Sequence, residues 1–253
     1  MTGSLDPATW DGRRTSFGSV AAEYAALRPG YPADAVGFVL GDRPRRVVDV
    51  GAGTGLLTEQ LVAAGHEVVA VDPSAEMLAQ LAARLPQVTT FVGSAEALPL
   101  PDGAVDAVVA GQAAHWFEPT GASREIRRVL RPGGVVGLIW NARDVRVPWV
   151  GALGELLTAE ARDHAADQSV VEAFLRELPA SGEYLESGIV QTVSPEQVVG
   201  GIGTRSYVAT MDDATRQAFL GRVRELLATH PDSRGRAELA LPYITSVHRL
   251  VPA

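Results

Sequence analysis

Short apolar runs and helical patterns alternate along the first half of the chain. Several runs rich in valine and other β-branched residues have the length of buried strands. They lie at residues 47–50, 67–71, 88–92, 104–110 and 135–140. Apolar residues at helical spacing fill segments between these runs, at 56–64, 74–85 and 123–130. Strands that alternate with helices in this way predict a parallel sheet with helices on both faces.

The two ends of the chain follow other patterns. A helical pattern begins at Ser16, and Pro29 ends it before a second helix at 33–40. After Asn141 the pattern becomes mainly helical. The expected helices lie at 149–160, 169–178, 195–200 and 212–230, and the expected strands at 186–193 and 241–250. These segments predict helical additions around an α/β core.

Length and composition favour a globular protein. The 253 residues include 22 basic and 30 acidic side chains, which gives a net charge of −8, and 46% are hydrophobic. We expect one α/β domain over residues 1–253. Its expected parts are a loose arm at 1–15, N-terminal cap helices at 16–46, a ligand-binding core at 47–142, and a helical lid with the last strands at 143–253.

Composition also excludes several classes of function. The acidic balance argues against nucleic acid as the main partner, because phosphate binding needs a basic face. The chain has no cysteine, which excludes disulfides, thiolate metal sites and cysteine nucleophiles. It has no lysine either, which excludes Schiff-base lysines and ordinary P-loop NTPases. Neither a signal peptide nor an apolar run of membrane-spanning length stands out, so we expect a cytoplasmic protein without a membrane partner.

A glycine-rich motif links the first predicted strand to the next helix. It reads Asp49-Val50-Gly51-Ala52-Gly53-Thr54-Gly55. Glycines there let the backbone turn tightly and let a ligand approach it closely. Asp72 ends the second strand, 72 − 51 = 21 residues after Gly51, where its carboxylate can accept both hydroxyls of a ribose. The alternative is a tight turn without a ligand, but such a turn needs neither three glycines nor a placed acid.

Two residues discriminate between kinds of nucleotide. The dinucleotide fingerprint requires glycine at position 56, where this chain has Leu56. Asp49 precedes the loop by two residues, and its carboxylate would repel a pyrophosphate but attract an ammonium or sulfonium group. The sequence therefore predicts a nucleoside that carries positive charge and no pyrophosphate. An NAD(P)-dependent oxidoreductase is the alternative that these two residues disfavour.

These motifs resemble those of class I S-adenosylmethionine-dependent methyltransferases that act on small molecules. The resemblance covers residues 16–142 well and the rest only in general plan. Besides the loop and Asp72, it is carried by the segments 93–99 (GSAEALP), 112–117 (QAAHWF) and 130–134 (LRPGG). The segment 24–32 (YAALRPGYP) resembles the N-terminal helix of a branch that includes trans-aconitate-type methyltransferases.

The resemblance implies a fold and a reaction. The fold would be Rossmann-like, with a seven-stranded, mainly parallel sheet flanked by helices and with helical cap or lid additions. The reaction would transfer a methyl group from S-adenosylmethionine to a small-molecule acceptor and leave S-adenosylhomocysteine as product. The loop from Gly51 to Gly55 would bind the methionine part of the cofactor, and Asp72 would hold the ribose.

The remaining contacts with the cofactor are also implied by the resemblance. Ser94 stands where many relatives have an aspartate that meets the adenine amino group, so the backbone N–H of Ala95 is the expected substitute. Carbonyl groups of Gly111 and Gln112 would accept from the methionine ammonium. The full set of expected cofactor-binding residues is Tyr24, Arg28, Asp49, Gly51, Ala52, Gly53, Asp72, Pro73, Met77, Ser94, Ala95, Glu96, Gly111, Gln112 and Trp116.

Two side chains have competing interpretations. Arg28 shares a helix face with Tyr24 and is expected to pair with the methionine carboxylate, although it could also be a packing arginine. His115 follows a predicted strand at the expected ligand edge and is the candidate general base. Alternatively, His115 and Trp116 form a packing element of the cofactor pocket, which we favour. A base is needed only where the acceptor must lose a proton.

Other properties of the site stay open at the level of sequence. No metal site is expected, because Asn141 and Asp144 lack a diagnostic spacing. The identity of the acceptor, the atom that is methylated and the oligomeric state do not follow from the residues. A cofactor-binding protein without transferase activity also fits the motifs.

Overall fold

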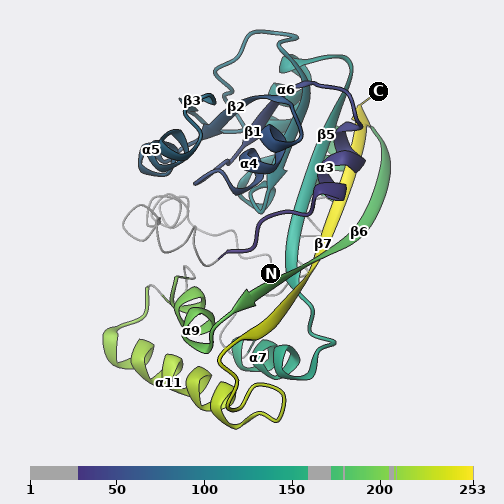
Figure 1. Cartoon of the computed structure of the whole chain (residues 1–253). Coiled ribbons are helices and arrows are strands. Elements are labelled where there is room, and N and C mark those ends of the chain that lie inside the picture. Colours follow the sequence, from purple (N-terminus) through teal and green to yellow (C-terminus); the bar gives the residue numbers. More distant parts are fainter. Residues whose placement is uncertain (1–27, 159–171, 179, 205–207, 209, 253) are drawn as a thin grey trace, which may run out of the picture.

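The computed structural model describes residues 28–158, 172–178, 180–204, 208 and 210–252 of the chain. Its centre is a seven-stranded sheet in the order β3-β2-β1-β4-β5-β7-β6 (Figure 1). The strands are β1 (Arg46–Val50), β2 (Glu67–Asp72), β3 (Thr89–Val92), β4 (Val105–Gly111), β5 (Leu130–Arg143), β6 (Ala180–Val193) and β7 (Leu239–Pro252). Strands β1 to β5 pair in parallel, and β7 runs antiparallel between β5 and β6. This arrangement confirms the expected Rossmann-like class I methyltransferase fold.

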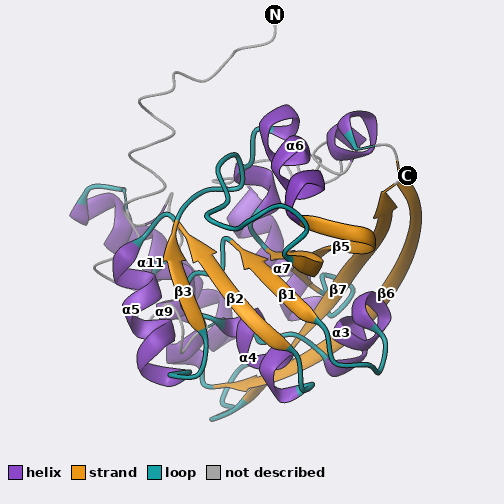
Figure 2. Ribbon diagram, turned by 90° about the horizontal axis from the view of Figure 1, so that it is seen from above, coloured by secondary structure: helices purple, strands orange, loops and turns teal. Residues whose placement is uncertain are grey.

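Helices cover both faces of the parallel strands, as Figure 2 shows. On one face lie α3 (Ala33–Leu40), α4 (Leu56–Ala63) and α5 (Ala75–Arg84), and on the other lies α6 (Pro119–Val129). One apolar cluster joins α6 to the sheet, and another joins α3 and α4 to it. Burial on both faces explains why the strands are apolar runs instead of alternating patterns.

The helices that follow the parallel strands form an extension. They are α7 (Pro148–Thr158), α9 (Pro195–Gly203) and α11 (Asp213–Thr229). These helices share an apolar cluster with the end of β6 and the beginning of β7, which includes Val193, Leu239 and Leu241. Figure 1 shows the extension on the side where β5 leaves the sheet for α7. The extension therefore stands at the carboxyl edge of the parallel strands.

The structure corrects the predicted start of one helix. Helix α6 begins at Pro119 and not at Ser123, because the carboxylate of Glu118 accepts hydrogen bonds from the backbone N–H groups of Thr120 and Gly121. A proline in the first turn is compatible with such a start, since its missing N–H would have no helical partner.

Two strands also begin five or six residues before their sequence patterns. Strand β5 begins at Leu130, which pairs with Val105, and a register irregularity follows before Val135 pairs with Ala107. Gly133, with φ +77°, lies within that irregularity. Strand β6 begins at Ala180 and not at Glu186, because each residue from 180 to 193 pairs with β7. Pairing with a neighbour thus extends strands beyond their apolar runs.

Some expectations fall outside the described residues. They are the arm at 1–15, the helix from Ser16 and the position of Tyr24. Of the helix expected at 169–178, residues 172–177 are described and are helical. Within the described part of the chain, no helix is both long and apolar enough to cross a bilayer.

Candidate functional site

The carboxyl ends of β1, β2 and β4 bring the glycine-rich loop, Asp72 and Gly111 to one edge of the sheet. The loop begins directly after Val50 and turns back against β2. The backbone N–H groups of Gly51 and Ala52 both donate to the carbonyl of Val71, at 2.8 and 3.2 Å. Residues 51–53 are partly exposed, whereas the strand before them is buried. A ligand at this edge would therefore meet the loop backbone.

Asp72 holds the loop from the tip of β2. Its Oδ2 accepts a hydrogen bond from the backbone N–H of Gly53 at 2.8 Å, and its Oδ1 accepts one from that of Ser74 at 2.8 Å. The residue is only 7% exposed. Hydrogen bonds from backbone N–H groups to a carboxylate are among the stronger ones in proteins. The expected ribose acceptor is thus also the group that fixes the position of Gly53.

The conformation of the loop requires glycine at two positions in particular. Gly51 has φ +72°, and a Cβ there would lie 2.4 Å from the Cβ of Ala113. Gly55 is the N-cap of α4 with φ +90°, and its Cβ would lie 2.7 Å from Leu81. Left-handed φ values and close neighbours both exclude larger side chains here. The sequence motif therefore has a direct steric cause.

Asp49 is a buried carboxylic acid beneath the loop. It is 1% exposed, and its Oδ2 accepts a hydrogen bond from the hydroxyl of Thr58 on α4 at 2.6 Å. Within the described residues, Oδ1 of Asp49 has no hydrogen-bond partner. Burial, reinforced by the negative charge of Asp72, raises the pKa of Asp49 to about 7, although the hydrogen bond from Thr58 opposes this rise. A cation next to Oδ1 would favour the ionised form.

The tip of β4 has an unusual backbone. Gln112 has φ +56° and is the one described residue other than glycine with a positive φ. Its N–H donates to the carbonyl of Ile139 at 2.9 Å, and its side-chain amide donates to that of Asn141 at 2.6 Å. Gly111 precedes it, and a Cβ on Gly111 would lie 2.6 Å from the hydroxyl of Tyr31.

The segment expected at the adenine has its own local structure. Ser94 and Ala97 form an isolated antiparallel bridge, and Ala95 between them is buried. The carboxylate of Glu96 accepts from the backbone N–H of Glu118 at 2.9 Å, so it ties this segment to the start of α6. Ser94 is partly exposed.

The other expected residues surround the same edge. Pro73 is exposed after β2, and Met77 is buried on α5, with its sulfur 3.6 Å from the position of a Cβ on Gly53. Trp116 and His115 lie in the short 3₁₀ helix η2 (Ala114–Trp116), and their ring centroids are 5.0 Å apart. Arg28 is partly buried ahead of α3.

Sequence reasoning missed several polar groups near this edge. They are Thr58 below the loop, Tyr31 beside Gly111, and Thr245 of β7, whose hydroxyl donates to the side chain of Asn141 at 2.6 Å. The sequence pattern indicates no role for Asn141 beyond the metal site with Asp144 that its spacing does not support. The carboxylate of Asp144 instead accepts from the side chain of Arg146 at 2.7 Å.

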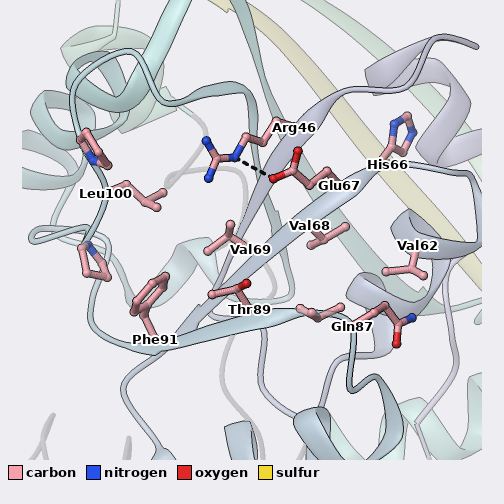
Figure 3. Close-up of a pocket in the computed structure, with 13 residues that line it drawn as sticks. Arg46, Val62, His66, Glu67, Val68, Val69, Gln87, Thr89, Phe91 and Leu100 are labelled. Carbon is pink, nitrogen blue, oxygen red and sulfur yellow. Dashed lines mark ion pairs between the residues drawn. The ribbon is translucent and has the colours of Figure 1, made fainter.

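A pocket of about 410 Å³ lies elsewhere (Figure 3). Its lining includes Arg46 and Glu67, the first residues of β1 and β2, whose side chains form an ion pair at 3.1 Å. Phe91 of β3 also lines it. Because Asp72 ends β2 while Glu67 begins it, this pocket belongs to the opposite end of the strands from the glycine-rich loop.

Comparisons with known proteins agree with this arrangement. A family model described as a methyltransferase domain matches residues 48–138. The chain is 44% identical over 230 residues to an uncharacterized methyltransferase of Mycobacterium tuberculosis, a match that covers 91% of this chain and 93% of the relative.

Two solved structures illustrate the likeness in three dimensions. One, proposed to be a type II methyltransferase from Anaeromyxobacter dehalogenans, has a TM-score of 0.69 and 28% identity, and the match covers 89% of this chain and 97% of that one. The other is an N-methyltransferase from Haemonchus contortus with phosphomonomethylethanolamine and S-adenosylhomocysteine bound. It shares the fold, with a TM-score of 0.53 and 15% identity over 98% of this chain and 60% of that one. The match to the mycobacterial relative covers nearly the whole chain, and the fold agrees with it. The chain therefore belongs to the class I methyltransferase family.

Proposed function

We propose that the chain transfers a methyl group from S-adenosylmethionine to a small-molecule acceptor. The observation that carries this proposal is the joint position of the glycine-rich loop, Asp49 and Asp72 at one edge of the sheet. The loop offers backbone that a ligand can approach closely, and the two carboxylates suit the hydroxyls and the cationic end of the nucleoside. The S-adenosylhomocysteine bound by the Haemonchus contortus protein, which has the same fold, supports this cofactor.

The electrostatics of the edge favour this cofactor over NAD(P). Asp49 already has its pKa raised by burial and by Asp72, so a pyrophosphate close by would raise the cost of ionisation further. An ammonium or sulfonium group would instead lower the cost of ionising Asp49. In addition, α4 starts with Leu56 where a dinucleotide site requires glycine.

Residues of the core and the extension would have separate tasks. The core at 47–142 would hold the cofactor, together with Tyr24 and Arg28 of the cap at 16–46, while the extension at 143–253 would enclose the acceptor. This division is supported by the position of α7, α9 and α11 at the carboxyl edge of the parallel strands (Figure 1). Methyl transfer from a sulfonium requires mainly that the nucleophile, methyl carbon and sulfur are held in line, which an enclosed acceptor allows.

Titration calorimetry tests the cofactor, and turnover tests the reaction. We expect S-adenosylmethionine and S-adenosylhomocysteine to bind while NADH does not. Tighter binding of NADH would reject the proposal in favour of an oxidoreductase. Formation of S-adenosylhomocysteine that depends on an added small molecule then separates an enzyme from a protein that only binds the cofactor.

Affinity for S-adenosylhomocysteine should rise with pH through about 7. Its ammonium is expected beside Asp49, so binding requires the ionised carboxylate, and the pKa of Asp49 in the free protein is about 7. Since apparent affinity scales with the fraction of the competent form, binding at pH 6 should be about tenfold weaker than at pH 8. Calorimetry across this range measures the effect. The Asp49→Asn variant should show a flat profile; an unchanged slope in that variant would place the titration elsewhere.

His115→Ala should weaken cofactor binding. The imidazole lies against Trp116 in η2, with ring centroids 5.0 Å apart and ring planes tilted by 44°, and we propose that this pair packs against the cofactor instead of moving a proton. The dissociation constant for S-adenosylhomocysteine measures the change, and His115→Asn should restore part of it because it keeps some bulk. A general base would behave differently: affinity would be kept, while turnover would fall by about 10²–10⁴-fold.

A further inference from the structure

We propose that Asn141 is a positioning residue, which aligns the protein groups that receive the methionine end of the cofactor. This inference rests on the proposed function. Asn141 is on β5, one strand beyond Gly111 and Gln112 of the β4 tip. Among the described residues, its hydrogen bonds beyond the sheet ladder join it to Gly30, Gln112 and Thr245, and none joins it to the glycine-rich loop or Asp72. Its effect on the cofactor would therefore pass through its neighbours.

Both the side chain and the backbone of Asn141 take part in hydrogen bonds to other elements. Its Nδ2 donates to the carbonyl of Gly30 at 2.9 Å, and its Oδ1 accepts from the hydroxyl of Thr245 at 2.6 Å. Its own carbonyl accepts from the side-chain amide of Gln112 at 2.6 Å. One residue thus connects the entry to α3, the tip of β4 and strand β7.

The bond to Gln112 supports a strained backbone. A left-handed φ is uncommon for a residue other than glycine, and it persists where the surroundings over-determine it. Gln112 is held at both ends here, by its N–H to Ile139 and by its side chain to Asn141. Its backbone carbonyl, the expected acceptor for the methionine ammonium, is therefore kept in one direction.

The bond to Gly30 acts on the other side of the same ligand. Gly30 is two residues after Arg28, the expected partner of the methionine carboxylate, and Pro29 between them limits the backbone. Tyr31, the next residue, is 7% exposed and packs close to Gly111. Asn141 therefore anchors two parts of the expected cofactor site. One is the segment that carries the guanidinium of Arg28, and the other is the strand tip that carries the backbone carbonyl of Gln112.

The carbonyl of Gly30 sets the orientation of the amide, because it can only accept a hydrogen bond and therefore requires Nδ2 on its side. Thr245 is fully buried and pairs with Asn141 across the β5–β7 ladder. Its hydroxyl can donate to Oδ1 only when the amide points its Nδ2 the other way, toward Gly30. An aspartate at position 141 would keep the acceptor for Thr245 but would turn an oxygen toward the carbonyl of Gly30. Asn141→Asp is thus a nearly isosteric test of the bond to Gly30.

Two ligands separate positioning from general stability. S-Adenosylhomocysteine has the amino acid end, whereas 5′-methylthioadenosine lacks it and keeps the nucleoside. For Asn141→Asp we expect about tenfold weaker binding of the first ligand and less than a twofold change for the second, both by calorimetry. Thr245→Val should act in the same direction with a smaller effect, and it supplies the comparison if Asn141→Asp does not fold.

A matched control and a double variant complete the experiment. Ser187→Ala removes hydrogen bonds at 2.8 Å between β6 and Asp34 of α3, away from the strand tip, and should change neither affinity. In an Arg28→Ala background, Asn141→Asp should cost less than it does alone, because its route through Arg28 is already lost. Equal losses of both ligands, or no loss of either, would overturn the positioning role alone. Binding of neither ligand by the unmodified protein would overturn the proposed function as well.

Discussion

Gly51→Ala should reduce affinity for S-adenosylhomocysteine by about 100-fold or more, or prevent detectable binding. The new Cβ would lie 2.4 Å from the Cβ of Ala113, which belongs to the segment after β4 and has no flexible end to move away. Left-handed φ adds strain of about 1–2 kcal/mol for any residue with a Cβ. Relief of the overlap would displace the loop or the 113–117 segment, and both border the expected cofactor position. Calorimetry and the melting temperature of the same sample measure the two consequences.

Gly235→Ala is the matched control for this variant. Gly235 has φ +71°, close to the +72° of Gly51, but a Cβ there would meet nothing within 4 Å. The Gly235→Ala variant should therefore lose about 1–2 kcal/mol of unfolding free energy through backbone strain alone and keep its affinity for S-adenosylhomocysteine. If Gly51→Ala bound S-adenosylhomocysteine like the unmodified protein, the loop would not be the cofactor site.

The parallel core could be predicted from the sequence because its strands are buried on both faces. Runs such as 47–50 and 67–71 have no polar alternation, and the structure places them within a residue or two of β1 and β2. The glycine-rich loop was equally visible. Its left-handed φ values and the closeness of Ala113 exclude most residues other than glycine. The backbone conformation of the loop is therefore visible in the sequence as a run of glycines.

Contacts between distant segments could not be predicted in the same way. Asn141 meets Gly30, Gln112 and Thr245, which lie between 29 and 111 residues away along the chain. Hydrophobic periodicity does not predict hydrogen bonds between such distant residues, since each partner alone is an ordinary polar residue or a glycine. Likewise, Asp72 suggested a ribose acceptor by its distance from Gly51, but its hydrogen bond to the N–H of Gly53 depends on how the loop folds back.

The ends of individual elements were harder to predict for a related reason. Strand β6 begins before its alternating apolar residues, because β7 offers a partner along its whole length. Helix α6 begins earlier than its apolar pattern, because Glu118 caps it with its own carboxylate. In both places a tertiary or capping interaction determined the boundary, while hydrophobic spacing determined only the type of element.

Asp72→Ala should weaken binding of S-adenosylhomocysteine by about 10–100-fold. The substitution removes the acceptor for the backbone N–H groups of Gly53 and Ser74, each at 2.8 Å, and the expected acceptor for the ribose hydroxyls. Hydrogen bonds to a charged group contribute about 1.5–3 kcal/mol each, so loss of one such bond to the ligand gives a change of this size. Calorimetry at pH 8, where Asp49 is ionised, measures it.

Asp106→Ala separates the local effect from loss of stability. Asp106 of β4 also accepts from a backbone N–H, that of Arg46 at 2.8 Å, but at the opposite end of the sheet. The Asp106→Ala variant should have a lower melting temperature and an unchanged affinity for S-adenosylhomocysteine. Equal losses of affinity in both variants would show that Asp72 is only structural.

The Asp72→Ala variant should also shift the pH dependence of binding. Because the charge of Asp72 helps to raise the pKa of Asp49, its removal should lower that pKa and move the rise in affinity to lower pH.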